Sequence, residues 1–329
     1  MSFEVTIQSS GHKFSAEAEE SILEAALRGG MNVNYNCSAG SCGDCKAKIV
    51  SGNTAVFQKN EYPLTEAEKI QGFVLLCSVK AQSDLIIDVH EALQAQDIPK
   101  QDITVKVAKV ERFNEDILVL YLRTPRSKTL RFLAGQEIDL LIADFPPLPL
   151  AIASCPCNGM VLQFHLQRDH PHPAVRYIFD ELKPFDSIHL IGPFGGFTLE
   201  ESSDRAIVMV AEGTGLAPIK SLIEHAIALD LSQSMYLFWL VDADKTHYYS
   251  NYCRSWELAL DCFVYIPLTI QRSGYTDYQA YKKSLDNVLA RCPVESEVDL
   301  YLAGSDLMLQ IFTDGFSARG TPFDRIKLA

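Results

Sequence analysis

Four cysteines have the spacing and the neighbours needed to hold an electron-transfer centre. Cys37, Cys42 and Cys45 are separated as C-x4-C-x2-C in a loop of small residues, and Cys77 follows much further along the chain. This spacing is typical of four thiolate ligands to a [2Fe-2S] cluster. Each iron takes two thiolates, so the chain must wrap around the cluster. The glycines of the loop let backbone N–H groups approach the sulfides, which stabilises the charge added on reduction.

Two other roles for these cysteines are less compatible with the sequence. A disulfide framework is disfavoured because the chain has nine cysteines, an odd number, and starts without an evident secretory signal. A zinc site would favour paired C-x2-C units, and this region has only one. The spacing therefore favours the cluster, with Cys37, Cys42, Cys45 and Cys77 as its ligands.

The segments around the cysteines predict how they are positioned. Strands are predicted at residues 3–8, 13–16, 46–50 and 84–89, and a helix at residues 20–28. The helix carries Leu23, Ala26 and Leu27 on one face and stops at two glycines. The order of strands, helix, cysteine loop and last ligand is a β-grasp arrangement. Residues 1–92 thus resemble a plant-type [2Fe-2S] ferredoxin domain.

The rest of the chain divides into a linker and two further domains. Residues 93–102 are polar and contain a proline, which predicts a linker. Short alternating segments predict a small antiparallel β-barrel of the flavin-binding type over residues 103–201, with a helix near 172–182. Residues 202–329 alternate buried strands with helices, which predicts an open parallel α/β domain of the NAD(P)-binding type. The predicted fold class is α+β and α/β, multidomain.

Composition limits the functions to consider. The net charge of −13 argues against a general nucleic-acid binder, because phosphate binding needs clustered Lys and Arg. The apolar runs are too short for a transmembrane segment, and a cytoplasmic location is expected. The acidic charge fits ordinary solubility or, alternatively, a face that docks a basic redox partner.

Several motifs together resemble those of ferredoxin-fused members of the ferredoxin–NADP⁺ reductase superfamily. They are Phe132–Gln136, Gly192–Phe197, Gly213–Pro218 and Ala303–Ser305. The likeness is to CDP-6-deoxy-glucoseen reductases and to the reductases of dioxygenases and monooxygenases. It implies FAD and NAD(P)H as cofactors and an oxygenase or dehydrase component as the redox partner. The cofactor-binding candidates that it implies are Gly135, Gln136, Gly192, Pro193, Gly195, Gly213, Thr214, Gly215 and Gly304.

The flavin motif departs from the family pattern. The family has Arg-x-Tyr-Ser, in which the arginine pairs with the flavin diphosphate, the tyrosine packs on the ring and the hydroxyl lies near N5. Here Leu148, Leu150 and Ala151 stand in those positions. The next family element, Gly-x-x-Ser, falls on residues 173–176 and is not recognisable. Arg168 and Arg176 are the candidate replacements for the missing cation, because a buried diphosphate without one is costly.

The nicotinamide motifs depart as well. Glu212 replaces the first glycine of Gly-Gly-Thr-Gly and brings a carboxylate close to the expected pyrophosphate. Phe238-Trp239-Leu240 replaces an aromatic-Gly-x-Arg turn. Ala303 stands where the family usually has a cysteine beside the nicotinamide.

Two hypotheses follow from this sequence. In the first, the chain is a reductase component that passes electrons from NAD(P)H through flavin to the cluster and on to an oxygenase or dehydrase. A flavin is required in it because a hydride delivers two electrons and the cluster accepts one at a time. In the second, the chain is a ferredoxin-type one-electron carrier whose reductase-like region has lost its cofactors and serves as a scaffold or docking module. The overall layout favours the first, and no separate catalytic residue is predicted.

Two smaller clusters have competing interpretations. Cys155-Pro156-Cys157 is interpreted as a rigid turn with two buried thiols, and alternatively as a metal or redox pair. His165, His170 and His172 are interpreted as exposed loop histidines, and alternatively as a metal site. Trp239 and the pair Tyr248-Tyr249 are expected to line the core or a pocket.

Overall fold

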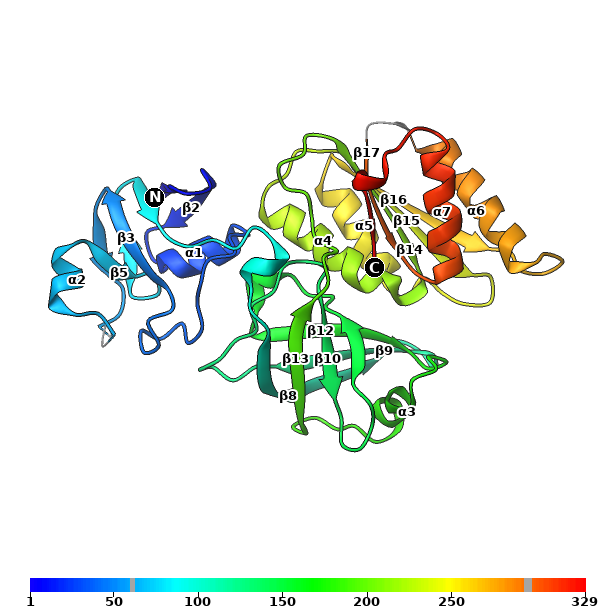
Figure 1. The fold of residues 1–329 in the computed structure, drawn as a ribbon, viewed down its shortest axis with the longest axis horizontal. Coiled ribbons are helices and arrows are strands. Elements are labelled where there is room, and N and C mark those ends of the chain that lie inside the picture. The colour runs from blue at the N-terminus through cyan, green and yellow to red at the C-terminus, as the bar shows by residue number, and fades with distance from the viewer. Residues whose placement is uncertain (60–62, 293–297) are drawn as a thin grey trace.

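The computed structural model describes residues 1–59, 63–292 and 298–329, and these form three parts, each built around its own sheet. In Figure 1 the N-terminal part lies on the left in blue and cyan. The barrel lies at the bottom centre in green, and the C-terminal part lies at the upper right in yellow and red. The predicted fold class is confirmed.

The N-terminal part is a five-stranded β-grasp sheet with one main helix across it. Its strands are β1 (Ser2–Ile7), β2 (Lys13–Glu17), β3 (Lys46–Ser51), β5 (Phe73–Leu75) and β7 (Leu85–Asp88), in the order β2-β1-β7-β3-β5. Helix α1 (Ile22–Arg28) starts at a capping box in which the Ser21 hydroxyl accepts from the Glu24 N–H. Short strands β4 (Thr54–Val56) and β6 (Val79–Ala81) pair separately. Helix α2 (Glu66–Ile70) follows Thr65, which forms a capping box with Glu68.

The middle part is a nearly closed antiparallel barrel of six strands. These are β8 (Gln101–Arg112), β9 (Ile117–Arg123), β10 (Glu137–Leu141), β11 (Leu148–Ala151), β12 (Val161–Gln167) and β13 (Ser187–Phe194), in the order β11-β10-β13-β8-β9-β12. The Ala153 N–H donates to the Gln163 carbonyl at 2.7 Å and brings the two ends of the sheet together. Helix α3 (Pro173–Asp180) buries its apolar face on the barrel core, as the sequence predicts.

The C-terminal part is an open parallel sheet covered on both faces. Strands β14 (Ala206–Glu212), β15 (Met235–Asp242), β16 (Phe263–Ile270), β17 (Val298–Ala303) and β18 (Ile326–Leu328) lie in the order β16-β15-β14-β17-β18. Helices α4 (Leu216–Ala228) and α5 (Ser250–Ala259) pack on one face, and α6 (Asp277–Arg291) and α7 (Asp306–Ser317) on the other. The strand order reverses between β14 and β17, and sheets of this kind bind ligands in the crevice at such a point.

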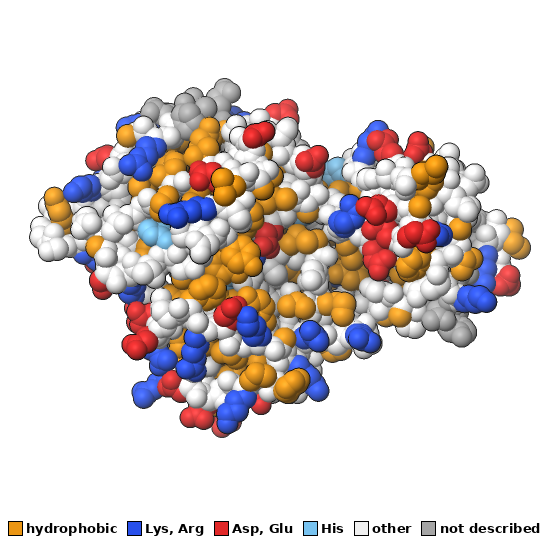
Figure 2. Space-filling view, turned by 180° about the vertical axis from the view of Figure 1, so that it is seen from behind, with side chains coloured by type: hydrophobic (Ala, Val, Ile, Leu, Met, Phe, Trp, Pro, Cys, Tyr) orange, Lys and Arg blue, Asp and Glu red, His pale blue; other side chains and the backbone are white. Residues whose placement is uncertain are grey.

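The N-terminal part is docked against both other parts. The Thr129 hydroxyl of the barrel donates to the carbonyl of Asn36, next to Cys37, at 3.2 Å. Leu229, at the C-terminal end of α4, packs against the N-terminal core, where a Cβ on Gly30 would come within 2.9 Å of it. Seen from behind, hydrophobic side chains gather in the hollow where the parts meet (Figure 2).

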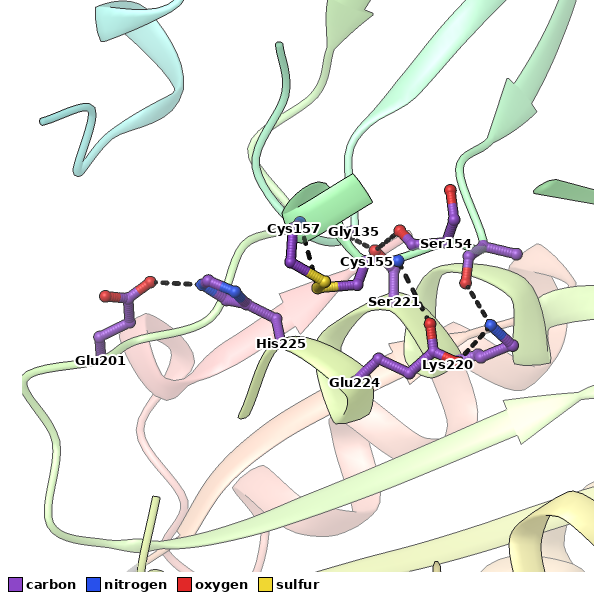
Figure 3. The surroundings of a disulfide bond; sticks show 10 residues. Gly135, Ser154, Cys155, Cys157, Glu201, Lys220, Ser221, Glu224 and His225 are labelled. Carbon is purple, nitrogen blue, oxygen red and sulfur yellow. Dashed lines mark hydrogen bonds and ion pairs between the residues drawn. A yellow bond between two sulfur atoms is a disulfide. The ribbon is translucent and has the colours of Figure 1, made fainter. Parts of the chain in front are cut away.

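The Cys155-Pro156-Cys157 segment lies close to this junction. It forms the predicted turn, with a 3-10 helix at Pro156–Asn158. The interpretation of the pair as two buried thiols is wrong, because the structure joins Cys155 and Cys157 in a disulfide. The turn brings their Cα atoms to 5.2 Å. Figure 3 shows the disulfide beside α4, where the Cys155 N–H donates to the Glu224 carboxylate at 3.2 Å.

Within the described residues, no helix has both the length and the apolar character needed to cross a membrane.

Candidate functional site

The cysteine loop places backbone N–H groups around its sulfur atoms. The N–H groups of Ala39, Ser41 and Cys42 donate to the Cys37 sulfur at 3.3–3.4 Å. The N–H of Asp44 donates to the Cys42 sulfur at 3.5 Å. Such donors stabilise negative charge on sulfur, as a thiolate ligand requires.

The loop reaches this geometry through left-handed backbone. Ser38, Gly40 and Gly43 have φ values of 50°, 74° and 88°. A Cβ on Gly43 would lie 2.9 Å from the Pro63 side chain, so this position requires glycine for both its conformation and its space. The small residues of the motif are therefore explained by the turn that presents the sulfurs.

The four cysteines lie in two pairs. Cys37 and Cys42 interact through the loop, and the sulfurs of Cys45 and Cys77 are 3.4 Å apart and buried. Nowhere in the described chain do three or more His, Cys, Asp or Glu side chains converge as they would on a single metal ion. A two-by-two arrangement fits a cluster of two irons, each of which takes two thiolates.

The surroundings favour thiolates at one cysteine of each pair. Burial alone would raise the pKa of Cys37, but hydrogen bonds from Ser41, Ala39 and Cys42 lower it to about 6. The hydrogen bond from Cys45, against burial, lowers the pKa of Cys77 to about 6. The same hydrogen bond, together with burial, raises the pKa of Cys45.

A cavity of about 600 Å³ lies between the barrel and the C-terminal edge of the α/β sheet. Six of the nine predicted cofactor-binding residues line it: Gly135, Gly195, Gly213, Thr214, Gly215 and Gly304. Gln136, Gly192 and Pro193 do not line it. Gln136 is buried and links two loops, donating to the Gly195 carbonyl at 3.0 Å and accepting from the Leu133 N–H at 2.8 Å.

Two of these glycines are needed for packing within the protein. A Cβ on Gly135 would lie 2.1 Å from the Phe197 carbonyl oxygen, and one on Gly215 would lie 2.4 Å from the Ala303 carbonyl oxygen. The close approach of another backbone segment therefore requires glycine at both positions, whether or not a ligand binds.

The cavity also contains residues that the sequence motifs do not indicate. His165 lies on β12 and is buried, so its interpretation as an exposed loop histidine is wrong. Its Nδ1 is 2.8 Å from the Tyr248 hydroxyl, and within the described structure its Nε2 has no hydrogen-bond partner. Burial, and then the charge of Lys220, lower its pKa well below the ordinary value, so it is neutral at pH 7. The alternation of Leu162, Phe164 and Leu166 with polar residues predicts a solvent-facing side for His165, and its burial results from the contact with Tyr248.

His170 is exposed and lines the cavity, whereas His172 accepts from the Ala174 N–H at the start of α3. Trp239 and Tyr249 are buried in the core, as predicted.

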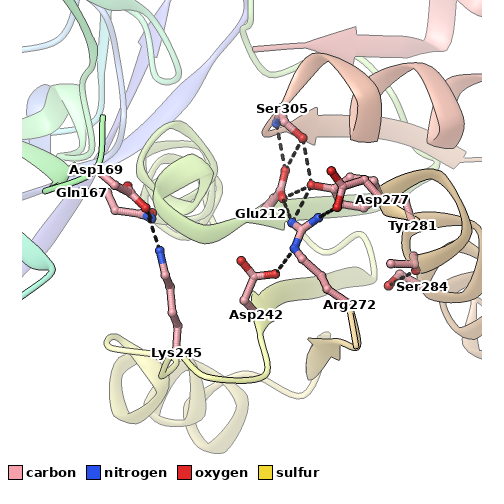
Figure 4. Close-up of polar contacts among 11 residues, drawn as sticks. Gln167, Asp169, Glu212, Asp242, Lys245, Arg272, Asp277, Tyr281, Ser284 and Ser305 are labelled. Carbon is pink, nitrogen blue, oxygen red and sulfur yellow. Dashed lines mark hydrogen bonds and ion pairs between the residues drawn. The ribbon is translucent and has the colours of Figure 1, made fainter. Parts of the chain in front are cut away.

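The cavity fits a flavin ring in size and in its apolar surface, which includes Pro149, Leu150 and Ala151 of β11. Its charges fit a diphosphate less well. Among the described lining residues the acids are Glu137, Glu212 and Asp242, and the one Lys or Arg is Lys245, which pairs with Asp169 at 3.0 Å (Figure 4).

Neither the position of the family's arginine, Leu148, nor the two candidate replacement arginines bring a cation to the cavity. Leu148 is fully buried in the barrel core. Arg168 pairs with Asp180 at 3.1 Å and donates to the Glu115 carbonyl. Arg176 is exposed and faces Asp180 at 3.7 Å. Neither arginine lines the cavity.

At the crevice between β14 and β17, Glu212 belongs to a polar network (Figure 4). Its carboxylate accepts from the Ser305 N–H at 2.9 Å, from the Ser305 hydroxyl at 2.7 Å and from Tyr281. Arg272 donates to Glu212 at 3.4 Å and to Asp242 at 2.6 Å. Hydrogen bonds to Tyr281, Asp242 and Asp277 raise the pKa of Arg272 against burial, so it stays charged.

A β-grasp domain with four paired cysteines, three of them in one loop, defines the class of ferredoxin-fused reductases when it is joined to a barrel and a nucleotide-binding type of sheet. Family models agree at both ends of the chain. Residues 5–82 match the 2Fe-2S iron-sulfur cluster binding domain, and residues 209–314 match the oxidoreductase NAD-binding domain.

Full-length relatives support the same class. The chain is 30% identical over 321 residues to CDP-6-deoxy-L-threo-D-glycero-4-hexulose-3-dehydrase reductase of Yersinia pestis, covering 97% of this chain and 95% of that protein. It is 31% identical over 316 residues to Protein RfbI of Salmonella typhimurium, covering 94% and 90%. The cytochrome P450 reductase GcoB of Amycolatopsis has the same fold, with a TM-score of 0.62 and 24% identity over 99% of this chain and 98% of that one.

The chain therefore belongs to the family of ferredoxin-fused reductases that includes the Yersinia dehydrase reductase. It is an iron–sulfur electron-transfer protein with an oxidoreductase NAD-binding domain. Membership of this family supports all three predicted cofactors, namely the [2Fe-2S] cluster, a flavin and a nicotinamide nucleotide.

Proposed function

We propose that this protein is a reductase component that takes electrons from NAD(P)H and delivers them singly, through its cluster, to an oxygenase or dehydrase partner protein. The observation that carries this proposal is the docked cysteine loop. Its sulfurs lie in two pairs with backbone donors around them, and Thr129 fixes the adjacent Asn36 to the part of the chain that contains the cavity.

The proposed assignments follow the domains. Residues 1–92 hold the cluster through Cys37, Cys42, Cys45 and Cys77. Residues 93–102 link them to the flavin-type barrel, residues 103–201, and to the NAD(P)-type domain, residues 202–329. A cytoplasmic location is part of this proposal, because it keeps the ligand thiols reduced, and the Cys155–Cys157 disulfide would be open to reduction there as well.

Residues of this chain would orient the cofactors as follows. The β11 edge, with Leu150 and Ala151, would cover the flavin ring, and Lys245 would face its phosphates. The Gly213–Gly215 turn opens α4 at the crevice edge and would receive the nucleotide. A bound flavin supplies the conversion of a two-electron hydride into single electrons.

A second candidate function is a ferredoxin-type one-electron carrier whose reductase-like region acts as a scaffold or docking module. The barrel favours it, because Leu148 is sealed in the core, and Arg168 and Arg176 lie at Asp180, away from the cavity. In the described barrel the flavin phosphates would thus meet neither of the candidate arginines.

One preparation separates the two candidates. Purified protein is precipitated with acid, released FAD is measured in the supernatant, and iron and sulfide are counted in the pellet. The reductase function predicts FAD together with iron, and bleaching of the visible spectrum on addition of NAD(P)H. Iron without flavin, even after incubation with FAD, would refute it, whereas bleaching by NAD(P)H would refute the scaffold function.

A further inference from the structure

The crevice between β14 and β17 is crossed by a side chain of the protein itself. Glu212 ends β14, and Ser305 follows β17 and forms the N-cap of α7. The Glu212 carboxylate accepts from both the N–H and the hydroxyl of Ser305. The carboxylate therefore connects the ends of the two strands between which the strand order reverses.

The donors at Ser305 are those that an anionic ligand would use. A helix start offers unpaired N–H groups and the positive end of the helix dipole, and phosphates bind there for both reasons. Here the Ser305 N–H is taken by a carboxylate at 2.9 Å. A phosphate group approaching this N–H must compete with Glu212.

The space beside Ser305 is filled as well. A Cβ on Gly304 would lie 2.5 Å from the Met308 Cε, 2.8 Å from the Glu212 Cβ and 3.0 Å from the Glu212 Oε2. The room that glycine leaves at this turn is thus occupied by the side chains of Glu212 and Met308. Tyr281 also donates to the same carboxylate and holds it from the α6 side.

The charge around the crevice is unfavourable for phosphate. Arg272 is surrounded by three carboxylates: Asp242 at 2.6 Å, Asp277 at 2.6 Å and Glu212 at 3.4 Å. One guanidinium faces three acids, so the network repels an incoming anion until one acid is removed or turned away.

We propose that Glu212 determines the affinity for the nucleotide: its carboxylate holds the Ser305 position, and the pyrophosphate of NAD(P)H must displace it in order to bind. Glu212 is then a specificity residue that keeps the crevice closed to weakly bound anions. This inference rests on the proposed reductase function for the identity of the ligand. The expected change in affinity rests on the contacts of Glu212.

The test measures binding of ADP-ribose, which carries the pyrophosphate without the nicotinamide, by isothermal titration calorimetry on the full chain. The variants are Glu212→Gln, which removes the charge, and Glu212→Gly, which removes the whole side chain. The matched control is Glu257→Gln, which makes the same chemical change at another carboxylate. The Glu257 carboxylate accepts from the Tyr265 N–H of β16, the edge strand of the sheet. Thermal melts confirm that each variant is folded.

We expect ADP-ribose to bind at least about tenfold more tightly to Glu212→Gln than to the natural protein, with a further gain in Glu212→Gly. The control should bind like the natural protein. Equal or weaker binding by both Glu212 variants, or no binding by any protein, would overturn the inference. If only one variant folds, its affinity alone decides.

NAD(P)H-driven bleaching separates this inference from the proposed function. Tighter ADP-ribose binding without bleaching in any variant would leave the role of Glu212 standing and refute the reductase function. Bleaching of the natural protein, together with ADP-ribose affinities that are the same in the Glu212 variants, would support the reductase function and refute the role of Glu212.

Discussion

The cysteine loop and the nucleotide crevice both present backbone N–H groups to a place for negative charge, but that place is filled differently. In the loop, Ala39, Ser41 and Cys42 point their N–H groups at a ligand sulfur. In the crevice, the N–H of Ser305 is taken by the carboxylate of Glu212. The loop is organised for a cofactor, whereas the crevice is already satisfied by the protein itself.

This difference shows that backbone N–H groups in a glycine-containing turn can have two different roles. Backbone donors serve a cofactor where the side chain that accepts from them is itself a ligand. In the loop that side chain is the proposed cluster ligand Cys37. At the crevice Glu212 is long enough to cross from β14 to the end of β17. Motif glycines alone therefore do not tell the two situations apart.

The largest expected effect comes from removing a cysteine of the cysteine loop. Replacing Cys42 with Ser removes one of the four proposed ligands, and we expect the visible and EPR signals of the cluster to be lost. Cys262→Ser, at a half-buried free cysteine of the α/β part, is the matched control and should keep both signals. An unchanged spectrum in Cys42→Ser would refute the ligand assignment.

A smaller effect is expected from disrupting the polar network of Glu212 at the crevice. Replacing Arg272 with Ala leaves Glu212 and Asp242 without their shared cation, and charged hydrogen bonds of this kind contribute about 1–3 kcal/mol. Urea unfolding followed by tryptophan fluorescence should shift to lower urea, while absorbance from the cluster stays unchanged in native buffer. Arg254→Ala, at an exposed position of α5, is the control. Loss of the cluster signal in Arg272→Ala would mean that the two regions are not independent.

The smallest effect is a pH dependence at the edge of the N-terminal part. The hydrogen bond to Glu91, against burial and with the charges of Glu91 and Glu201, raises the pKa of His12 above 6.5. The stabilisation is therefore complete below pH 6.5 and is lost as the pH rises through the raised pKa. Because a third of the side chain is exposed, we expect less than about 1 kcal/mol.

His12→Gln should abolish this pH dependence in urea unfolding monitored by cluster absorbance. A dependence that persists in the variant would assign it to another group.

What the sequence predicts well is local. The cysteine spacing, the turn glycines and the Thr65–Glu68 capping box lie within a few residues of one another, and each has a direct steric or hydrogen-bonding reason. The class of each domain could also be predicted, because strand alternation and buried apolar runs distinguish a barrel from a parallel sheet.

What the sequence does not predict depends on contacts between distant segments. Glu212 and Ser305 are 93 positions apart, so the sequence shows a carboxylate in the motif but not the group that it binds. His165 is buried because Tyr248 packs over it from another domain. The disulfide of Cys155 and Cys157 depends on the bend of the turn between them.

Helix α4 has a consequence for how the molecule is held together. It begins directly after the Gly213–Gly215 turn at the crevice, and the residue that caps its other end, Leu229, lies in the N-terminal core beneath Gly30. A helix of its 13 residues is a stiff rod about 20 Å long. The N-terminal part is thus not suspended from its linker alone. Helix α4 thus sets a fixed distance between the crevice and the N-terminal part. An electron that passes from one to the other must cross this distance.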